Sequence, residues 1–300
     1  MKKKVIQFFL LLVCGFFVYE IFHAYERRNE GFTIEKIQST LPFSPDYEVK
    51  STPEQLAQAN KIFEQPFYYL GHGFQCYAFV SADDQYVLKF FRYQRMRLPE
   101  FAYHLPDIAP VRNYLARKAV DYATRRNYLF NGIKVGFENA SDETALLFVH
   151  MNKTVGQHPT LTIYNKVGTR FEVPLDQVEF MLQRKARLVK PVLDELMAAG
   201  QIDEAKARLD QIYALLVRCA KRGICDTDGA LIRKNNLGYL GDTCIYIDSG
   251  KLCLKEEIKQ KERFERDLRR LRPLAKWLEQ KYPPLAKHFE ETRKKVLNEF

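Results

Sequence analysis

The chain has 300 residues, enough for one large domain or two lobes with a substantial buried core. Its 46% hydrophobic and 28% charged residues are typical of a folded protein and exclude a disordered one. The formal charge of +10 suits an anionic ligand or a membrane surface as well as nucleic acid. Because the sequence has no zinc-ligand spacing, no RNA-binding aromatic motif and no arginine-rich tract, we expect no nucleic-acid partner.

The N-terminus carries lysines at positions 2–4 before an apolar stretch from Val5 to Phe22, interrupted by Gln7 and Glu20. This length suits a short membrane-spanning helix or the core of a signal peptide. No small-residue cleavage site follows, which favours an uncleaved, single-pass anchor over residues 1–27. The alternative is a signal that is cleaved before secretion. The lysines would keep the N-terminus cytoplasmic and place the body across the membrane, but we leave the side open.

The next part of the chain predicts a β-rich region. We expect a linker and a short helix over residues 28–65, the helix beginning at Ser51 or Thr52 before Pro53. Aromatic and β-branched runs then predict strands on either side of a polar turn at 82–85. Further on, the patterns predict a helix over 110–131, with Leu115, Val120, Tyr122 and Leu129 as candidates for its buried face, a strand over 145–151 and a hairpin within 160–174.

After Pro174 the pattern becomes helical. We expect helices from residue 175 to Gly200 and from 203 to Gly223, followed by a strand at 244–248. The basic tail, 254–300, should form amphipathic helices broken at Pro273 and at Pro283. Its inward-facing residues would be Phe264, Leu268, Leu271 and Trp277. The six cysteines include Cys14 in the apolar N-terminus, which leaves an odd number for the body and favours free thiols.

Two segments carry residues suited to chemistry. In "LGHGFQCYAF", Gly71 and Gly73 lie between a strand and its return, where glycines let the backbone approach a phosphate closely. A plain tight turn is the alternative. On the following strand, "YVLKFF", Lys89 is surrounded by apolar residues, so its ammonium needs an anionic partner. A surface lysine is the alternative there.

The second segment is "GICDTDGALIRKNNLGYLGDTCIYIDSGKL", residues 223–252. Asp226 and Asp228 follow a helix, Asn235 and Asn236 come next, and Asp248 ends a strand. Carboxylate and amide oxygens are hard ligands suited to Mg²⁺, which binds through few protein groups and substrate phosphates. A loop of turn-forming residues is the alternative.

The order of these features resembles the protein-kinase-like superfamily, over residues 66–255. The resemblance implies a two-lobed α+β fold, with a β-rich N-lobe containing one helix (66–151) and a small, mainly helical C-lobe (152–300), behind the N-terminal hydrophobic helix. The strand at 145–151 would enter the hinge. The resemblance also implies ATP and Mg²⁺ as cofactors. Gly71 and Gly73 match loop glycines over the phosphates and Lys89 matches the lysine that holds them.

The same resemblance assigns roles to the second segment. Asp228 is the first choice for the catalytic base and Asp226 the second. Asn236, with Asn235 as its rival, and Asp248 match the metal ligands. The histidine of H-R-D is missing, and Asp228 to Asn236 is three residues longer than the kinase spacing. Asp121 is the only acid on the 110–131 helix and therefore the candidate partner of Lys89, together with Asp248.

The favoured interpretation is an ATP- and Mg²⁺-dependent phosphotransferase tethered to a membrane. A catalytically silent pseudokinase that acts as a binding module is the second hypothesis, and a membrane-tethered structural protein is the third. Nucleotide binding and turnover distinguish them. The acceptor, a protein or a small molecule, the activity and the oligomeric state stay open.

Overall fold

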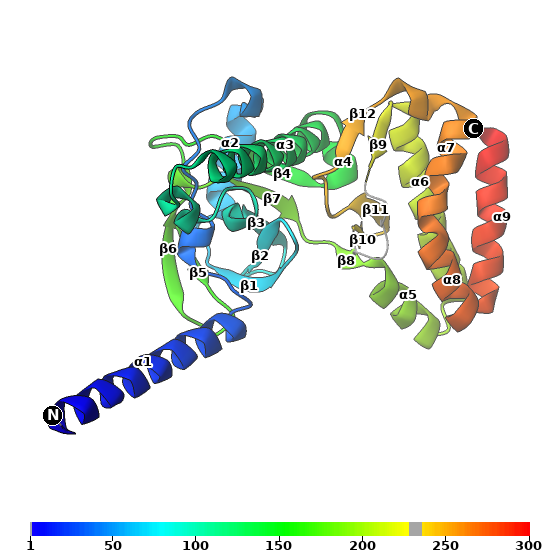
Figure 1. Ribbon diagram of the computed structural model, residues 1–300. Helices are drawn as coiled ribbons and strands as arrows, with labels where there is room; N and C mark the ends of the chain where they lie inside the picture. Colours follow the sequence, from blue (N-terminus) through cyan, green and yellow to red (C-terminus); the bar gives the residue numbers. More distant parts are fainter. Residues whose placement is uncertain (1, 228–235) are drawn as a thin grey trace.

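The computed structural model describes residues 2–227 and 236–300, with side chains described from residue 13 onward. The body has two lobes that lie side by side (Figure 1). We call residues 29–184 the sheet lobe and residues 187–300 the helical lobe. The mixed α+β class is the expected one.

The first helix, α1 (Lys2–Arg28), projects away from the body (Figure 1). Its described side chains include several exposed large apolar residues, namely Phe16, Phe17, Val18, Tyr19, Ile21 and Phe22. Over the part of the chain that the structure describes, no helix is both long and apolar enough to cross a membrane.

The sheet lobe contains a seven-stranded sheet in the order β4-β7-β3-β2-β1-β5-β6. Its strands are β1 (Phe67–His72), β2 (Cys76–Ser81), β3 (Tyr86–Phe91), β4 (Leu146–His150), β5 (Thr160–Tyr164), β6 (Arg170–Pro174) and β7 (Phe180–Arg184). The β2–β3 and β5–β6 hairpins agree with the alternation in the sequence. All pairs are antiparallel except β1 with β5.

Two sequence predictions fail at β7. We expected residues 175–189 to be helical, but Phe180–Arg184 forms a buried strand between β3 and β4. The apolar run "FMLQR" fits a strand buried on both faces as well as a helix, and the neighbouring strands decide between them. We also began the second lobe at residue 152, whereas 160–184 belongs to the first sheet. The chain therefore leaves the sheet lobe through β7 and not through β4.

Helices α2 (Pro53–Ile62), α3 (Ala109–Asn139) and α4 (Ser141–Thr144) complete the sheet lobe. The start of α2 has the expected cap, because Thr52 accepts from the Gln55 backbone and the Gln55 side chain accepts from the Thr52 backbone. Helix α3 packs against β4 and also against β12 of the other lobe. Short 3₁₀ turns lie at Ile34–Lys36, Pro45–Tyr47, Tyr93–Arg95, Glu100–His104 and Leu175–Gln177.

The helical lobe packs around α6, whose buried face carries leucines, isoleucine and alanines. Its helices are α5 (Val189–Ala198), α6 (Ile202–Lys221), α7 (Lys261–Leu268), α8 (Arg272–Lys281) and α9 (Pro283–Glu299), with 3₁₀ turns at Glu256–Lys259 and Arg269–Leu271. Its strands are β8 (Arg187–Leu188), β9 (Ile224–Asp226), β10 (Leu237–Leu240), β11 (Thr243–Tyr246) and β12 (Leu252–Leu254). Strand β8 pairs with β10 and β12 pairs with β9.

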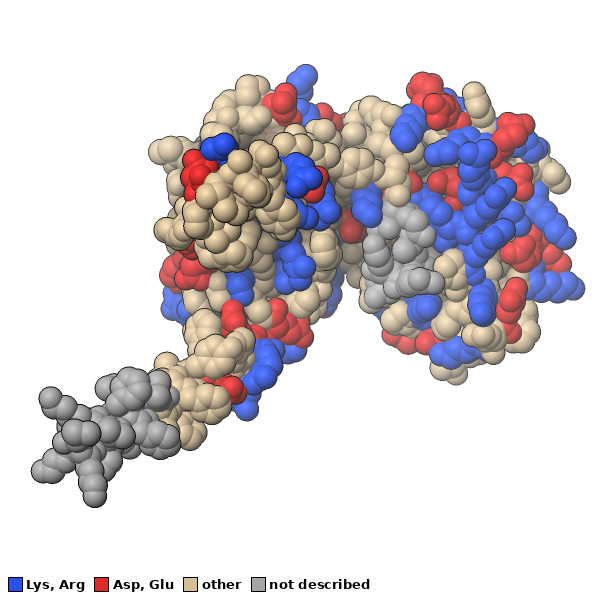
Figure 2. All heavy atoms as spheres, in the orientation of Figure 1, with Lys and Arg blue, Asp and Glu red and all other residues tan. Residues whose placement is uncertain are grey.

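The basic tail behaves as expected. Phe264, Leu268 and Leu271 are buried and Trp277 packs against the same core. Proline lies in the first turn of both α8 and α9, where a missing backbone N–H costs nothing. Lysines and arginines gather over this lobe with acidic residues among them, so the surface is a mixed charged face (Figure 2).

Candidate functional site

The glycine hairpin joins β1 to β2. The pairing shifts register between Tyr69 and Gly71, and Gly71 has φ 155°, a conformation that favours glycine. The Gly73 N–H donates to the Cys76 carbonyl at 2.9 Å. A Cβ added at either glycine would meet no heavy atom within 4 Å. The backbone here is therefore open to a ligand.

Arg92, at the end of β3, supports this hairpin. Its Nη1 donates to the Gly73 carbonyl at 2.7 Å, and its guanidinium lies 4.7 Å from the centre of the Tyr77 ring. The residue is only 8% exposed. A buried, charge-assisted hydrogen bond of this kind restrains the position of the hairpin tip relative to the sheet.

Lys89 reaches from β3 into the junction of the two lobes. Its Nζ donates to Gln183 Oε1 at 2.8 Å and to the Ile247 carbonyl at 2.5 Å. Burial lowers the pKa of the ammonium, while the Asp248 charge acts in the opposite direction. The side chain is half-buried, as its apolar surroundings suggested. Contrary to our expectation, its hydrogen-bond partners are neutral oxygens and not a carboxylate.

Gln183 was missed in the sequence. It is buried on β7, diagonally across from Lys89, and its Nε2 donates to the carbonyls of Thr144 and Tyr246. The side-chain amide of Gln183 therefore bonds Lys89 in the sheet lobe and a backbone carbonyl of β11 in the helical lobe. The signal that could have found it is the glutamine directly after the apolar run "FML", because a buried amide needs partners for all its polar atoms.

Asp121 does not approach Lys89 through any described contact. It is exposed on the first half of α3, and the buried residues of this helix all lie between Leu129 and Phe137. Val120, expected on the buried face, is 64% exposed for the same reason. No residue in the first half of α3 is buried, so apolar periodicity there does not report burial.

Asp248, Ser249 and Gly250 form a turn packed between α3 and the glycine hairpin. The Gly250 N–H donates to Asp248 Oδ1 at 3.0 Å. A Cβ on Gly250 would lie 2.4 Å from Leu129 Cδ1 and 3.2 Å from Gln75 Oε1 at the hairpin tip. Opposite, a Cβ on Gly132 would lie 2.6 Å from the Gly250 carbonyl carbon. Two glycines therefore permit this close approach and fix the place of Asp248.

The residues suited to a metal are only partly described. Asp248 is exposed, and its Oδ1 accepts from the Gly250 N–H. Asn236 is buried directly before β10, and its backbone carbonyl accepts from the Ile247 N–H at 2.7 Å. Asp228 and Asn235 lie outside the described residues. Within the described ranges, no three His, Cys, Asp or Glu side chains gather as a metal site. One carboxylate and one amide fit Mg²⁺ only if phosphate oxygens complete the shell.

Asp226, the second choice for the base, is buried at the end of β9. Its carboxylate lies 3.9 Å from the Arg270 guanidinium, which also donates to its backbone carbonyl. This is the environment of a structural ion pair that ties β9 to the tail. The next residue, Thr227, bonds Tyr128 of α3, which ties the end of β9 to the sheet lobe.

The cysteines are free thiols, as expected. Cys225 and Cys253 are direct partners across β9 and β12, with their Sγ atoms 3.1 Å apart. Their hydrogen bond lowers the pKa of Cys253 to about 7 and raises that of Cys225.

Known proteins show little similarity to this chain. No protein-family model and no curated protein matches the chain. Among solved structures, the chain is similar to the bifunctional kinase-methyltransferase WbdD, with a TM-score of 0.38 and 17% sequence identity over 73% of this chain and 43% of that one. The chain thus spans less than half the length of that protein.

Proposed function

We propose that this chain is an ATP- and Mg²⁺-dependent phosphotransferase of kinase-like arrangement. The observation that carries the proposal is the hydrogen bond from Lys89 Nζ to the Ile247 carbonyl. This hydrogen bond joins Lys89 of the sheet lobe to the residue directly before Asp248 in the helical lobe. The turn after Asp248 lies under the tip of the glycine hairpin.

Each group has a distinct part in this proposal. The open backbone at Gly71 and Gly73 would cover the phosphates, and Lys89 would exchange its carbonyl partner for phosphate oxygens. Asp248 and Asn236 would hold Mg²⁺, which offsets the charge of the transferred group. Asp228 would accept the acceptor's proton. Catalysis would rest on positioning and charge stabilisation.

The second hypothesis, a silent pseudokinase, is favoured by one specific observation. Lys89 is held by neutral oxygens, and Asp121, its expected acidic partner, is exposed at a distance along α3. In protein kinases a lysine–glutamate pair must be in place for activity. This hypothesis predicts that the protein binds Mg-ATP but does not turn it over.

Incubation of the full chain with γ-labelled and α-labelled ATP tests the proposal. Transfer of the γ-label, lost in Lys89→Gln and kept in Lys185→Gln, is the expected result. Lys185 is a suitable control because its ammonium pairs with Asp84 in the turn between β2 and β3. Transfer of the α-label would indicate a nucleotidyl transferase, and no Mg²⁺-dependent ATP binding would contradict both hypotheses.

We also propose that residues 1–27 tether the protein to a membrane, on the basis of the apolar stretch and the exposed apolar face of α1. A C-terminal reporter should fractionate with membranes, and deletion of residues 1–27 should release it. A wholly soluble full-length product would contradict the tether.

A further inference from the structure

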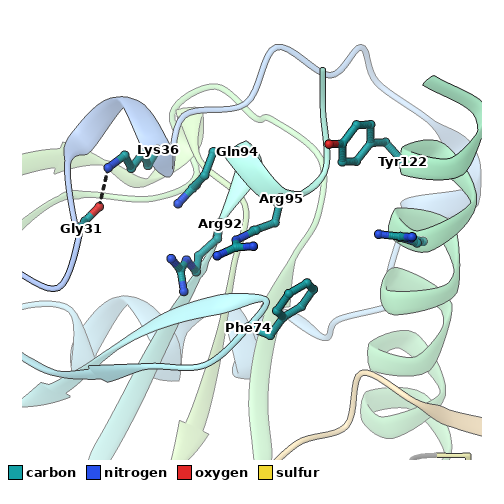
Figure 3. A pocket seen from close by; sticks show the side chains of 8 residues that line it. Gly31, Lys36, Phe74, Arg92, Gln94, Arg95 and Tyr122 are labelled. Atoms are coloured by element: carbon teal, nitrogen blue, oxygen red, sulfur yellow. Dashed lines mark hydrogen bonds between the residues drawn. The ribbon is translucent and has the colours of Figure 1, made fainter. Parts of the chain in front are cut away.

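A cavity of about 380 Å³ lies beside the tip of the glycine hairpin. Its walls come from the segment after α1, the hairpin tip, the end of β3 and the first half of α3. The residues are Gly31, Lys36, Phe74, Arg92, Gln94, Arg95, Tyr122 and Arg125. Figure 3 shows Arg92 and Arg95 close together between Lys36 and Tyr122.

The lining is cationic. It contains Lys36, Arg92, Arg95 and Arg125 and no acidic residue. Lys36 is neutralised by Glu26 at 2.9 Å, outside the lining. Among the described residues, neither Arg95 nor Arg125 forms an ion pair, and Arg95 stacks at 5.1 Å from the Phe74 ring. Three guanidinium groups that share one cavity repel one another unless an anion enters.

Arg92 supplies an independent indication. Although it is only 8% exposed, its Nε has no hydrogen-bond partner. A buried N–H without a partner is costly, and a bound anion is one way to satisfy it. Its Nη1 is already committed to the Gly73 carbonyl, so a ligand at Nε would also stiffen the hairpin.

The cavity is separate from the proposed nucleotide cleft but shares the hairpin with it. Phe74 lines the cavity, while the next residue, Gln75, lies against Gly250 beside Asp248. The first half of α3 forms one wall because it runs past the sheet and leaves Tyr122 and Arg125 uncovered by the core.

We propose that this cavity is a binding site for a phosphate monoester or diphosphate group. Arginine forks match phosphate oxygens in paired hydrogen bonds, and the phenol of Tyr122 can donate one more. The volume accommodates a phosphate group with part of the molecule that carries it. This site does not depend on phosphotransfer at Lys89.

Calorimetric titration of the full chain with inorganic pyrophosphate at low ionic strength tests the site. We expect saturable binding that weakens about tenfold or more in Arg95→Gln and in Arg125→Gln, because each removes a charge-assisted hydrogen bond. Arg117→Gln is the matched control, since Arg117 lies exposed on the same helix, outside the cavity. Thermal melts confirm that all variants fold.

Two further ligands distinguish the source of the phosphate. Glycerol 3-phosphate represents a free phosphorylated molecule, and vesicles with phosphatidic acid represent a lipid headgroup. Loss of binding to either one in the Arg95→Gln/Arg125→Gln variant, but not in Arg117→Gln, supports the site and identifies its source. Equal loss in the control, or no saturable binding of pyrophosphate by the wild type, overturns the proposal, whatever the outcome with ATP.

Discussion

The sheet lobe packs around aromatic rings, whereas the helical lobe packs around aliphatic side chains. Phe32, Phe63, Phe67, Phe79, Phe90 and Phe180 lie in the first core, and leucines from α5, α6, α8 and α9 dominate the second. The junction between them is mixed. It includes the Lys89 and Gln183 hydrogen bonds, the Arg222–Glu143 ion pair, and the packing of α3 against β12 and the Asp248–Gly250 turn.

This difference has a consequence for stability and activity. Each lobe has its own buried apolar core, whereas the junction also depends on polar groups that have specific partners. Changes at the junction should therefore affect function and lobe docking before they affect either core. Substitutions in the junction and in the sheet lobe test this contrast.

Asp248→Asn should reduce nucleotide turnover by about 10²–10³, roughly 3–4 kcal/mol in the activation free energy. The amide keeps the hydrogen bond from Gly250 but loses the charge that a Mg²⁺ ion needs. Steady-state rates and thermal melts measure the two effects. Asp242→Asn, an exposed change in the turn before β11, is the control. Equal turnover in Asp248→Asn and the wild type would remove Asp248 from the site.

Gln183→Leu should lower the free energy of unfolding by about 3 kcal/mol, because Lys89 and two buried carbonyls lose a partner. Urea titration measures this free energy of unfolding. Limited proteolysis should also cleave the variant faster than the wild type near residues 185–188, between the lobes. Gln177→Leu, at an exposed position of the same lobe, should have little effect. If both variants unfold alike, Gln183 does not join the lobes.

Acid should loosen the sheet lobe. Burial lowers the pKa of His150 to about 4, below its ordinary value of 6.5, with His158 acting in the same direction and Asp176 against it. Because the unfolded chain binds the proton more readily, the contribution of His150 is present above pH 6.5 and is lost as pH falls toward 4. Between pH 7 and pH 5 the loss is roughly 2 kcal/mol.

The pH dependence of urea unfolding tests this expectation. His150→Phe should be less stable at pH 7, where the wild type bonds the Val178 carbonyl, but its stability should fall less between pH 7 and pH 5. His104→Gln, on the surface, is the control and should keep the wild-type slope. An unchanged slope in His150→Phe would mean that another group titrates.

Gly132→Ala should lower stability by about 1–2 kcal/mol. The new Cβ would lie 2.6 Å from backbone atoms of Gly250, which no side-chain rotation can relieve. The loss should occur although alanine favours a helix by about 1 kcal/mol over glycine. Gly73→Ala, where a Cβ meets no heavy atom within 4 Å, is the control for stability. A Gly132→Ala protein as stable as the wild type would show that the turn can move.

Local patterns in the sequence predicted much of the fold. The hairpins β2–β3 and β5–β6, helix α3, helix α6 with its end at Gly223 and the proline breaks in the tail all follow from periodicity and turn residues. The sequence also predicted that Lys89 is half-buried, because a lysine on an apolar strand cannot keep its whole side chain in water.

Three features required the tertiary structure. Periodicity does not distinguish a short buried strand from a helix, so β7 depended on its pairing with β3 and β4. The partner of Lys89 is Gln183, 94 residues away, and diagonal pairing in a sheet is invisible in a linear pattern. Arg92, Arg95 and Arg125 share a cavity only because β3 ends beside the uncovered half of α3. Local preferences in the sequence were enough to place the hairpins and the long helices, whereas long-range packing decided that Phe180–Arg184 is a strand and which polar groups meet.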